Sequence, residues 1–332
     1  MSFQTIDQAK RLNKKIVLVR IDTNVPMAGK KVLDDSRLQA ILPTLRYLER
    51  KRAKIILISH LGRPNGKKVP SLSLKPIGYA LGKLLKTPIK VLALEQGAKA
   101  IRYEAEKNIV LLENIRFYKG EDTNSATLAK ELAKLGHIYI NDAFSVSHRA
   151  AASIVGIPKI LPSYAGFNLA AEVEALEKIK KSKGQKLVVI VGGAKIADKL
   201  PVLEKLLPKA MAILVGGGVA NNFLKAKKFP VGKSLVDESV MKQTRAILAK
   251  GKKKLILPID VICDNTRTAE HDAHWRFVKE VKPQERIVDI GPKTCQLYSS
   301  YIKKAKFGSL HTTIIFSYFY CCNNSSTFFL IT

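Results

Sequence analysis

Arginine and histidine side chains follow four apolar runs in the first half of the chain. The clusters are RIDTNVP at 20–26, SHLGRP at 59–64, ENIRF at 113–117, and NDAF at 141–144 with His148 and Arg149 beyond it. Arginine carries a planar fork of N–H donors that fits phosphate and carboxylate oxygens. Where parallel strands end at one edge of a sheet, such clusters meet and line a cleft. The sequence therefore predicts a site for a small molecule with several negative charges.

Each of these residues also has an ordinary structural explanation. Arg20 and Asp22 are close enough in the sequence to form a local ion pair, and a single histidine is more often a structural residue than a ligand. Four clusters at the same edge of one sheet favour the anion site over coincidence. Arg37, which follows Asp34 and Asp35 at the start of a helical pattern, belongs to the same set of basic residues.

Glycine-rich turns replace the arginines in the second half. VGGAKIADK covers 191–199 and VGGGVA covers 215–220, and each passes from a predicted strand into a predicted helix. Glycine lets a ligand approach the backbone, and free N–H groups at a helix N-terminus attract phosphate. Neither turn has the spacing of the Walker A or the G-x-G-x-x-G motif, and glycine is common at tight turns. We expect Lys195 and Lys199, one helical turn apart, to add a cationic face that favours nucleotide phosphates.

His271 and His274 have a spacing that could place two imidazoles on one helix face. They lie in a polar segment, Asp264–Trp275, without a third ligand at useful spacing. We therefore interpret this segment as a solvated loop and predict no metal site there.

The formal net charge of +30 fits a polyanionic ligand, either a nucleic acid or a small phosphorylated molecule. Much of the charge lies in lysine runs typical of a solvated surface, and no nucleic-acid-binding motif accompanies it, so we expect no nucleic-acid partner. The four cysteines show no paired zinc-type spacing, and so few cysteines in a long chain indicate a reducing compartment. No apolar stretch reaches the roughly 18 residues of a membrane span, and the start lacks the apolar core of a signal peptide. These features predict a cytoplasmic protein without membrane contact.

Short β-branched runs alternate with amphipathic helical patterns through most of the chain. This alternation predicts an α/β fold with doubly wound parallel sheets in two domains. Pro43, inside the first helical pattern, should kink that helix or mark its early turns. The expected strands are 16–21, 54–59, 89–94, 109–112, 138–141, 187–191, 212–215, 254–258 continuing into 261, and 287–290, and the expected helices are 36–52, 74–85, 125–135 and 172–183, the last ending at Gly184.

The composition changes abruptly near Phe307. The last 26 residues, FGSLHTTIIFSYFYCCNNSSTFFLIT, are rich in aromatic residues and nearly free of charge. A hydrophobic anchor is one interpretation, but NNSS at 323–326 interrupts the apolar run too early. A frameshifted or unrelated end is favoured, in which Thr313–Tyr320 could add a strand to an open sheet edge. The predicted organisation is a domain at 1–166, a connecting helix at 167–185, a partial domain at 186–306 and an aberrant tail at 307–332.

The chain resembles the phosphoglycerate kinases over roughly its first nine-tenths. The resemblance rests on motifs that follow the family's order: VRIDTNVP, DDSRLQAILPTLRYL, ISHLGRP, LLENIRFYKGE, YINDAFSVSHRA, IVGGAKIADKL, LVGGGVANNFLKA, GKSLV, LPIDVI and DIGPKT. It implies two Rossmann-like domains joined by a helix, with a cleft that closes by a hinge motion. It also implies a glycolytic kinase that moves a phosphoryl group between 1,3-bisphosphoglycerate and ADP, or in reverse between ATP and 3-phosphoglycerate, with Mg²⁺.

The resemblance also assigns roles to residues of this sequence. It makes Arg37 and Lys195 catalytic. The residues that it implies for the three-carbon acid are Asp22, Thr23, Asn24, Arg37, His60, Leu61, Gly62, Arg63, Arg116 and Arg149. Those that it implies for the nucleotide are Gly192, Gly193, Lys195, Lys199, Gly216 and Gly217.

The family pattern is lost after Lys306. The family continues there with Trp-Asn-Gly-Pro, Gly-Val-Phe-Glu and Gly-Gly-Gly-Asp-Thr segments, and none of these follows in this sequence. The resemblance therefore implies a second domain that is truncated and lacks the family's ribose-binding Glu and metal-linked Asp. Two functions stay open at this point: an active kinase, or a homologue that binds only 3-phosphoglycerate. We expect a monomer in either case.

Overall fold

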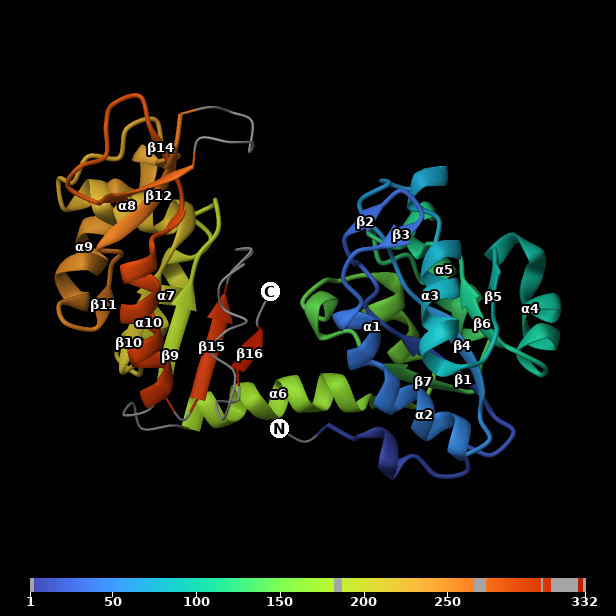
Figure 1. Cartoon of the computed structure of the whole chain (residues 1–332). Helices are drawn as coiled ribbons and strands as arrows, with labels where there is room; N and C mark the ends of the chain where they lie inside the picture. The colour runs from blue at the N-terminus through green and yellow to red at the C-terminus, as the bar shows by residue number, and fades with distance from the viewer. Residues whose placement is uncertain (1–2, 182–186, 266–272, 306, 312–327, 331–332) are drawn as a thin grey trace. The chain divides into compact units, whose positions relative to one another are not determined.

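The computed structural model describes residues 3–181, 187–265, 273–305, 307–311 and 328–330. The chain divides into two compact units, Met1–Glu174 and Ala175–Thr332, and each is described by itself (Figure 1).

The first unit is built on a six-stranded parallel sheet. The order across the sheet is β5-β6-β4-β1-β7-β8. All neighbours are parallel, so the carboxyl ends of the strands share one edge. The strands are β1 (Ile16–Arg20), β4 (Lys54–Ile58), β5 (Ile89–Leu92), β6 (Ile109–Leu112), β7 (Ile138–Asn141) and β8 (Ser163–Ala165), and a small hairpin joins β2 (Met27–Ala28) to β3 (Lys31–Val32).

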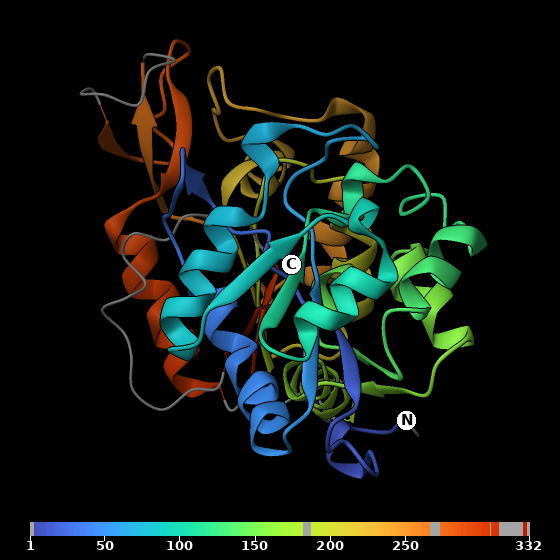
Figure 2. The ribbon, with the colours of Figure 1, turned by 90° about the vertical axis from the view of Figure 1, so that its right-hand side faces the viewer.

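Helices cover both faces of this sheet (Figures 1 and 2). Side chains of α1 (Ser36–Ala40), α2 (Leu42–Arg50) and α3 (Lys75–Leu85) pack in one buried cluster with alternate residues of the strands. Side chains of α4 (Gly97–Ala105) and α5 (Ala126–Ala133) pack against the remaining strand residues on the other face. The single helix expected over 36–52 is divided at Ile41, because Pro43 occupies the first turn of α2 and lacks the N–H that would continue α1. The predicted double winding is confirmed.

Helix α6 (Phe167–Lys181) begins five residues before the expected start at 172, and Gly184, its expected end, lies outside the described residues. The early start depends on Asp142, a fully buried carboxylate just after β7 whose Oδ1 accepts a hydrogen bond from Leu169 N at 3.0 Å. Gly166 makes room for it, since a Cβ at that position would lie 2.2 Å from Asp142 Oδ1. Burial raises the pKa of Asp142 to about 6.

The second unit contains a five-stranded parallel sheet in the order β11-β10-β9-β15-β16. Its strands are β9 (Leu187–Val191), β10 (Ala212–Val215), β11 (Leu255–Ile256), β15 (Phe307–His311) and β16 (Phe328–Leu330). By sequence order the first four strands stand 3-2-1-4, the arrangement of a Rossmann-like sheet. Phe307–His311 is thus the tail segment that joins β9, whereas the suggested strand at 313–320 lies outside the described residues.

The expected strand from 254 into 261 is two strands in two different sheets. β11 joins the parallel sheet, and β12 (Asp260–Asp264) forms a separate antiparallel sheet with β13 (His274–Phe277) and β14 (Arg286–Ile290). Pro258 stands between them and cannot donate to a ladder. The strand expected at 287–290 therefore belongs to the antiparallel sheet.

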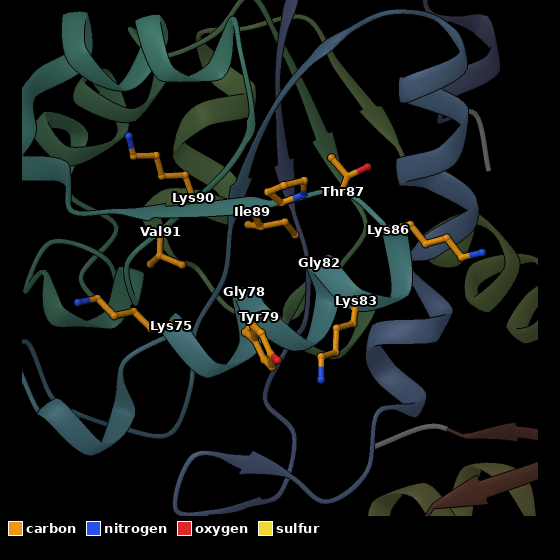
Figure 3. Close-up of a pocket in the computed structure, with 11 residues that line it drawn as sticks. Lys75, Gly78, Tyr79, Gly82, Lys83, Lys86, Thr87, Ile89, Lys90 and Val91 are labelled. Atoms are coloured by element: carbon orange, nitrogen blue, oxygen red, sulfur yellow. The ribbon is translucent and has the colours of Figure 1, made fainter.

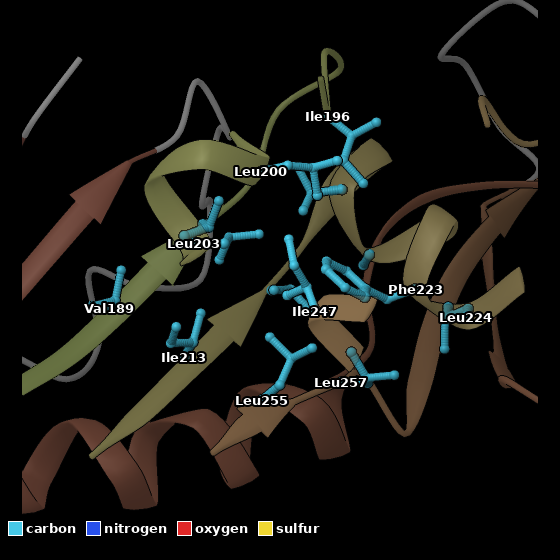
Figure 4. Close-up of a cluster of buried hydrophobic side chains, with 14 of the residues drawn as sticks. Val189, Ile196, Leu200, Leu203, Ile213, Phe223, Leu224, Ile247, Leu255 and Leu257 are labelled. Carbon is cyan, nitrogen blue, oxygen red and sulfur yellow. The ribbon is translucent and has the colours of Figure 1, made fainter. Parts of the chain in front are cut away.

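Helices α7 (Leu200–Leu206), α8 (Gly217–Ala226) and α9 (Met241–Gly251) cover one face of the parallel sheet of this unit. Figure 4 shows Leu203, Phe223 and Ile247 from these helices meeting Val189 and Ile213 of the strands. Helix α10 (Pro292–Lys304) covers the other face. Both parallel sheets are therefore doubly wound.

Candidate functional site

The four basic clusters of the first unit lie at one edge of its sheet. Arg20 ends β1 and His60 follows β4, its neighbour in the sheet. Arg116 lies just beyond β6, and Arg149 lies beyond β7 on the other side of β1. We call these four residues the basic cluster.

Arg20 and His60 form the buried centre of the basic cluster, with only 2% and 3% of their surfaces exposed. Arg20 Nη2 lies 3.2 Å from His60 Nδ1. Because a guanidinium only donates hydrogen bonds, Nδ1 accepts, and the ring proton is on Nε2. Burial, together with the charges of Arg20, Arg116 and Arg149, lowers the pKa of His60 to about 3. His60 is therefore a neutral N–H donor at neutral pH.

Arg116 and Arg149 complete the cluster with guanidinium groups that are less firmly paired. Burial and the charges of Arg149 and Arg20 lower the pKa of Arg116, although Asp122 opposes them. Arg116 Nη1 donates to the carbonyl of Gly62 at 2.8 Å. The Nε of Arg149 is buried and has no hydrogen-bond partner among the described residues. A donor of this kind is costly to leave unpaired, so the cluster fits an incoming anion.

Asp22 is paired with Arg37, so the Arg20–Asp22 ion pair considered above does not form. Asp22 also accepts hydrogen bonds from Asn24 N at 2.9 Å and from the hydroxyl of Ser145. Burial tends to raise the pKa of Asp22, but Arg37 and these hydrogen bonds together lower it. Arg37 stays about one third exposed and is held by a carboxylate that remains ionised.

Of the other candidate residues for the acid site, some are buried and some are exposed. Thr23 is fully buried and its hydroxyl lies 2.8 Å from Ser59 Oγ, while Leu61 is 5% exposed. Gly62 has a φ of +63° and its N–H donates to Asn24 Oδ1 at 2.9 Å, which fixes the turn after β4. The side chain of Arg63 is exposed. Thr23 and Leu61 therefore shape the site, and Asn24 and Arg63 present polar groups at its rim.

The two glycine turns lie side by side at the carboxyl ends of β9 and β10. The N–H of Val219 donates to the carbonyl of Gly193 at 3.2 Å, and the N–H of Gly216 donates to that of Val191 at 2.9 Å. A Cβ at Gly218 would lie 3.1 Å from the carbonyl oxygens of Gly193 and Ala194. A side chain at Gly218 would therefore require the Gly193–Ala194 turn to shift, and Gly216 is the N-cap residue of α8.

The expected placement of Lys195 and Lys199 on one helix is wrong. Helix α7 begins only at Leu200, so Lys195 lies in the turn and Lys199 is the residue that precedes the helix. Lys195 is exposed and Lys199 is half-buried. The start at Leu200 fits Pro201, because proline is tolerated in the first turn of a helix, where its missing N–H would have no intrahelical partner. The cations belong to the loop beside Gly192 and Gly193, not to a helix face.

His274 lies on β13 rather than in a solvated loop, and His271 lies outside the described residues. The Nε2 of His274 lies 3.0 Å from Glu285 Oε1, and Arg276 Nη2 donates to the same oxygen at 2.9 Å. Burial alone would raise the pKa of Glu285, but these hydrogen-bond partners and the charge of Arg276 lower it to about 2. The described residues contain no group of three or more His, Cys, Asp or Glu that could hold a metal ion.

A groove of about 700 Å³ between α3 and β5 lies apart from the basic cluster. It is lined by Lys75, Lys83, Lys86 and Lys90 around an apolar floor. Figure 3 shows that their amino groups point away from one another. Because these four amino groups point in different directions, they cannot all bind one small anion. This distinguishes the groove from the basic cluster.

The family model for phosphoglycerate kinase matches residues 6–310. The chain belongs to the phosphoglycerate kinase family. Membership makes it a kinase of the glycolytic type, a transferase. Of the described helices, none is long and apolar enough to cross a membrane.

Individual phosphoglycerate kinases agree with the family match. The chain is 44% identical over 313 residues to that of Herpetosiphon aurantiacus, covering 92% of this chain and 79% of the relative. It is 41% identical over 302 residues to that of Thermomicrobium roseum, covering 89% and 77%. The solved structure of the enzyme from Pyrococcus horikoshii OT3 matches with a TM-score of 0.81 at 28% identity, covering 92% of this chain and 80% of that one. The structure from Coxiella burnetii matches with a TM-score of 0.71 at 33% identity, covering 97% and 83%.

Sequence reasoning missed the serine hydrogen bonds that hold residues of the candidate acid site in place. Ser145 bonds Asp22, Ser59 bonds Thr23, and Ser153 bonds Arg20. Their partners lie 36 to 133 positions away in the sequence. A serine has no spacing signal that would reveal such a partner, so only the fold shows these contacts.

Proposed function

We propose that the chain transfers a phosphoryl group between 1,3-bisphosphoglycerate and ADP, and in reverse between ATP and 3-phosphoglycerate. The observation that supports this most directly is the basic cluster: the neutral His60 and Arg149, whose Nε has no partner among the described residues, follow strands that end at the same edge of the sheet. We assign the acid site to residues 1–166 and the nucleotide site to 186–306, in a monomeric cytoplasmic protein.

In this proposal the acid and its phosphate bind to the first unit. Arg116 and Arg149 neutralise phosphate and carboxylate charge, and His60 adds an uncharged N–H donor. Asn24 and Arg63 contact the ligand from the rim. Arg37, oriented by Asp22, stabilises the charge on the group in transfer. Phosphoryl transfer depends on positioning and charge neutralisation more than on a covalent nucleophile, and this set of residues supplies both.

The nucleotide binds to the glycine turns of the second unit. Gly192, Gly193, Gly216 and Gly217 allow close approach, and Lys195 and Lys199 face the phosphates. The described residues do not form a protein-only cage for Mg²⁺. Lys195 and Lys199 would stand beside the nucleotide phosphates, and the Mg²⁺ that the family uses would add further charge neutralisation there when bound.

Calorimetric titration with 3-phosphoglycerate tests the acid site. We expect Arg149→Gln to bind at least about tenfold more weakly, which corresponds to one lost charge-assisted hydrogen bond. Lys75→Gln removes the same charge from the same unit but from the diverging groove, so we expect a change below about twofold. Equal losses in both variants would reduce the site to general surface charge. A folded wild-type chain that binds no 3-phosphoglycerate would refute the proposal.

A coupled ADP/ATP assay in both directions tests the transfer step. Lys195→Ala should lower kcat, whereas Lys205→Ala, an exposed lysine on α7, should leave it unchanged. Binding of 3-phosphoglycerate without turnover in the wild-type chain would instead establish a homologue that only holds the acid.

A further inference from the structure

A buried chain of hydrogen bonds runs from His60 through Arg20 and Ser153 to the carboxylate of Glu121. Arg20 Nη2 contacts His60 Nδ1 at 3.2 Å, and Arg20 Nε donates to Ser153 Oγ at 3.0 Å. The Ser153 hydroxyl in turn donates to Glu121 Oε1 at 2.5 Å. All four residues are at most 3% exposed. The guanidinium charge of Arg20 is thus linked through one hydroxyl to the carboxylate of Glu121.

Glu121 also fixes the backbone that carries Ser153. Ser153 belongs to a π-helical turn, Ala152–Gly156, a rare conformation in proteins. The N–H of Ser153 donates to Glu121 Oε2 at 2.9 Å, and that of Ala152 donates to the Glu121 carbonyl at 3.0 Å. Tyr139 OH donates to the Ser153 carbonyl at 2.6 Å. The hydroxyl of Ser153 therefore has one available position, and its proton is committed to Glu121.

This arrangement leaves Arg20 a single orientation. With Nε on Ser153 and Nη1 on the carbonyls of Ile21 and Ile58, only Nη2 is directed at His60. A donor opposite Nδ1 excludes a proton on that nitrogen. The imidazole is consequently held as the tautomer with Nε2–H, the form that donates to a bound anion without bearing charge.

We propose that Ser153 and Glu121 are positioning residues that set the tautomer of His60 through Arg20. Ser153 and Glu121 are 0% and 2% exposed, so the role proposed for them acts through Arg20 rather than by ligand contact. The importance of this tautomer for acid binding rests on the function proposed above, but the tautomer itself is a property of the free protein.

The test is ¹⁵N NMR of the histidine ring in the ligand-free full chain. In the wild type, His60 Nδ1 should resonate as a bare acceptor nitrogen and Nε2 as an N–H nitrogen. Ser153→Ala and Glu121→Gln should move both resonances toward a mixture of tautomers and weaken 3-phosphoglycerate binding by roughly tenfold. Glu121→Gln keeps the shape of the side chain, so it tests the idea even where Ser153→Ala does not fold.

Ser125→Ala is the matched control. Ser125 caps α5 by accepting from Leu128 N at 3.4 Å in the same unit, so its loss affects stability without touching the chain to His60. We expect its His60 resonances to match the wild type. Unchanged His60 nitrogens in a folded Ser153 or Glu121 variant, or a wild-type proton on Nδ1, would overturn the inference whatever the binding result. A wild type with the expected tautomer but no 3-phosphoglycerate binding would overturn the proposed function and leave the positioning intact.

Discussion

Asp142 offers a pH-dependent test of how the first unit is held together. Its carboxyl group is fully buried against the first turn of α6, and burial raises its pKa from 3.8 to about 6. A raised pKa means that the folded state prefers the neutral form. The associated stability is fully present below pH 3.8 and is lost as the pH rises through about 6.

The size of the effect follows from the shift. About two pK units correspond to about 3 kcal/mol between the neutral and the ionised form. Asp142→Asn removes the ionisation and keeps an oxygen that can accept from Leu169 N. We therefore expect the free energy of unfolding of the variant, relative to wild type, to rise by about 1.4 kcal/mol between pH 5 and pH 8, because the rest of the ~3 kcal/mol is already lost between pH 3.8 and pH 5.

Amide hydrogen exchange on β1 and β4 measures this difference, because those strands report the first unit alone. Protection in variant and wild type is compared at each pH, so intrinsic exchange rates cancel. Glu131→Gln, an exposed carboxylate on α5, serves as the control and should show no such trend. A difference between Asp142→Asn and wild type that stays constant from pH 5 to pH 8 would refute the reasoning.

Two further predictions concern the second unit, and one of them uses a glycine of the first unit for comparison. Glu285→Gln should lower the free energy of unfolding of the second unit by about 2 kcal/mol at pH 7. This figure is smaller than the pKa shift alone would give, because the Arg276 partner is partly exposed. Urea unfolding followed by the fluorescence of Trp275, the chain's one tryptophan, measures the loss. Since the Glu285 pKa is lowered to about 2, this loss should shrink as the pH falls from 4.5 toward 2, and a loss that is independent of pH would contradict it. Gly232→Ala should cost several times more stability than Gly29→Ala, as both have positive φ but a Cβ at Gly232 would lie 2.1 Å from the Glu285 carbonyl while Gly29 faces open space. Equal melting-temperature losses for the two glycine variants would show that the backbone conformation alone matters.

The sequence predicts the basic cluster well because its logic is local. Parallel strands such as 109–112 and 138–141 are apolar runs whose ends can be read directly, and the polar residues after them must gather at one edge. The same logic fails where the apolar signal is weak. Strand β8, Ser163–Ala165, is only three residues long and carries no apolar run.

What the sequence does not predict depends on distant partners. Ser153 and Arg20 are separated by 133 positions, and the Asp22–Arg37 pair prevails over a nearer Arg20–Asp22 pair only because of how the turns fold back. His274 illustrates the same limit, since a polar segment conceals a strand residue bonded to a buried glutamate. Lys195 and Lys199 show that a helical spacing predicts a shared face only if the helix has already begun.

Both parallel sheets place their first strand in the interior, and this has a consequence for synthesis. Val17 of β1 pairs with Ile138, which is synthesised 121 positions later, and Leu187 of β9 pairs with Phe307, which is synthesised 120 positions later. At the usual pace of a ribosome this is on the order of ten seconds during which an apolar strand has one open edge. Each half of the nascent chain therefore passes through an interval in which pairing with a neighbouring chain competes with its own completion.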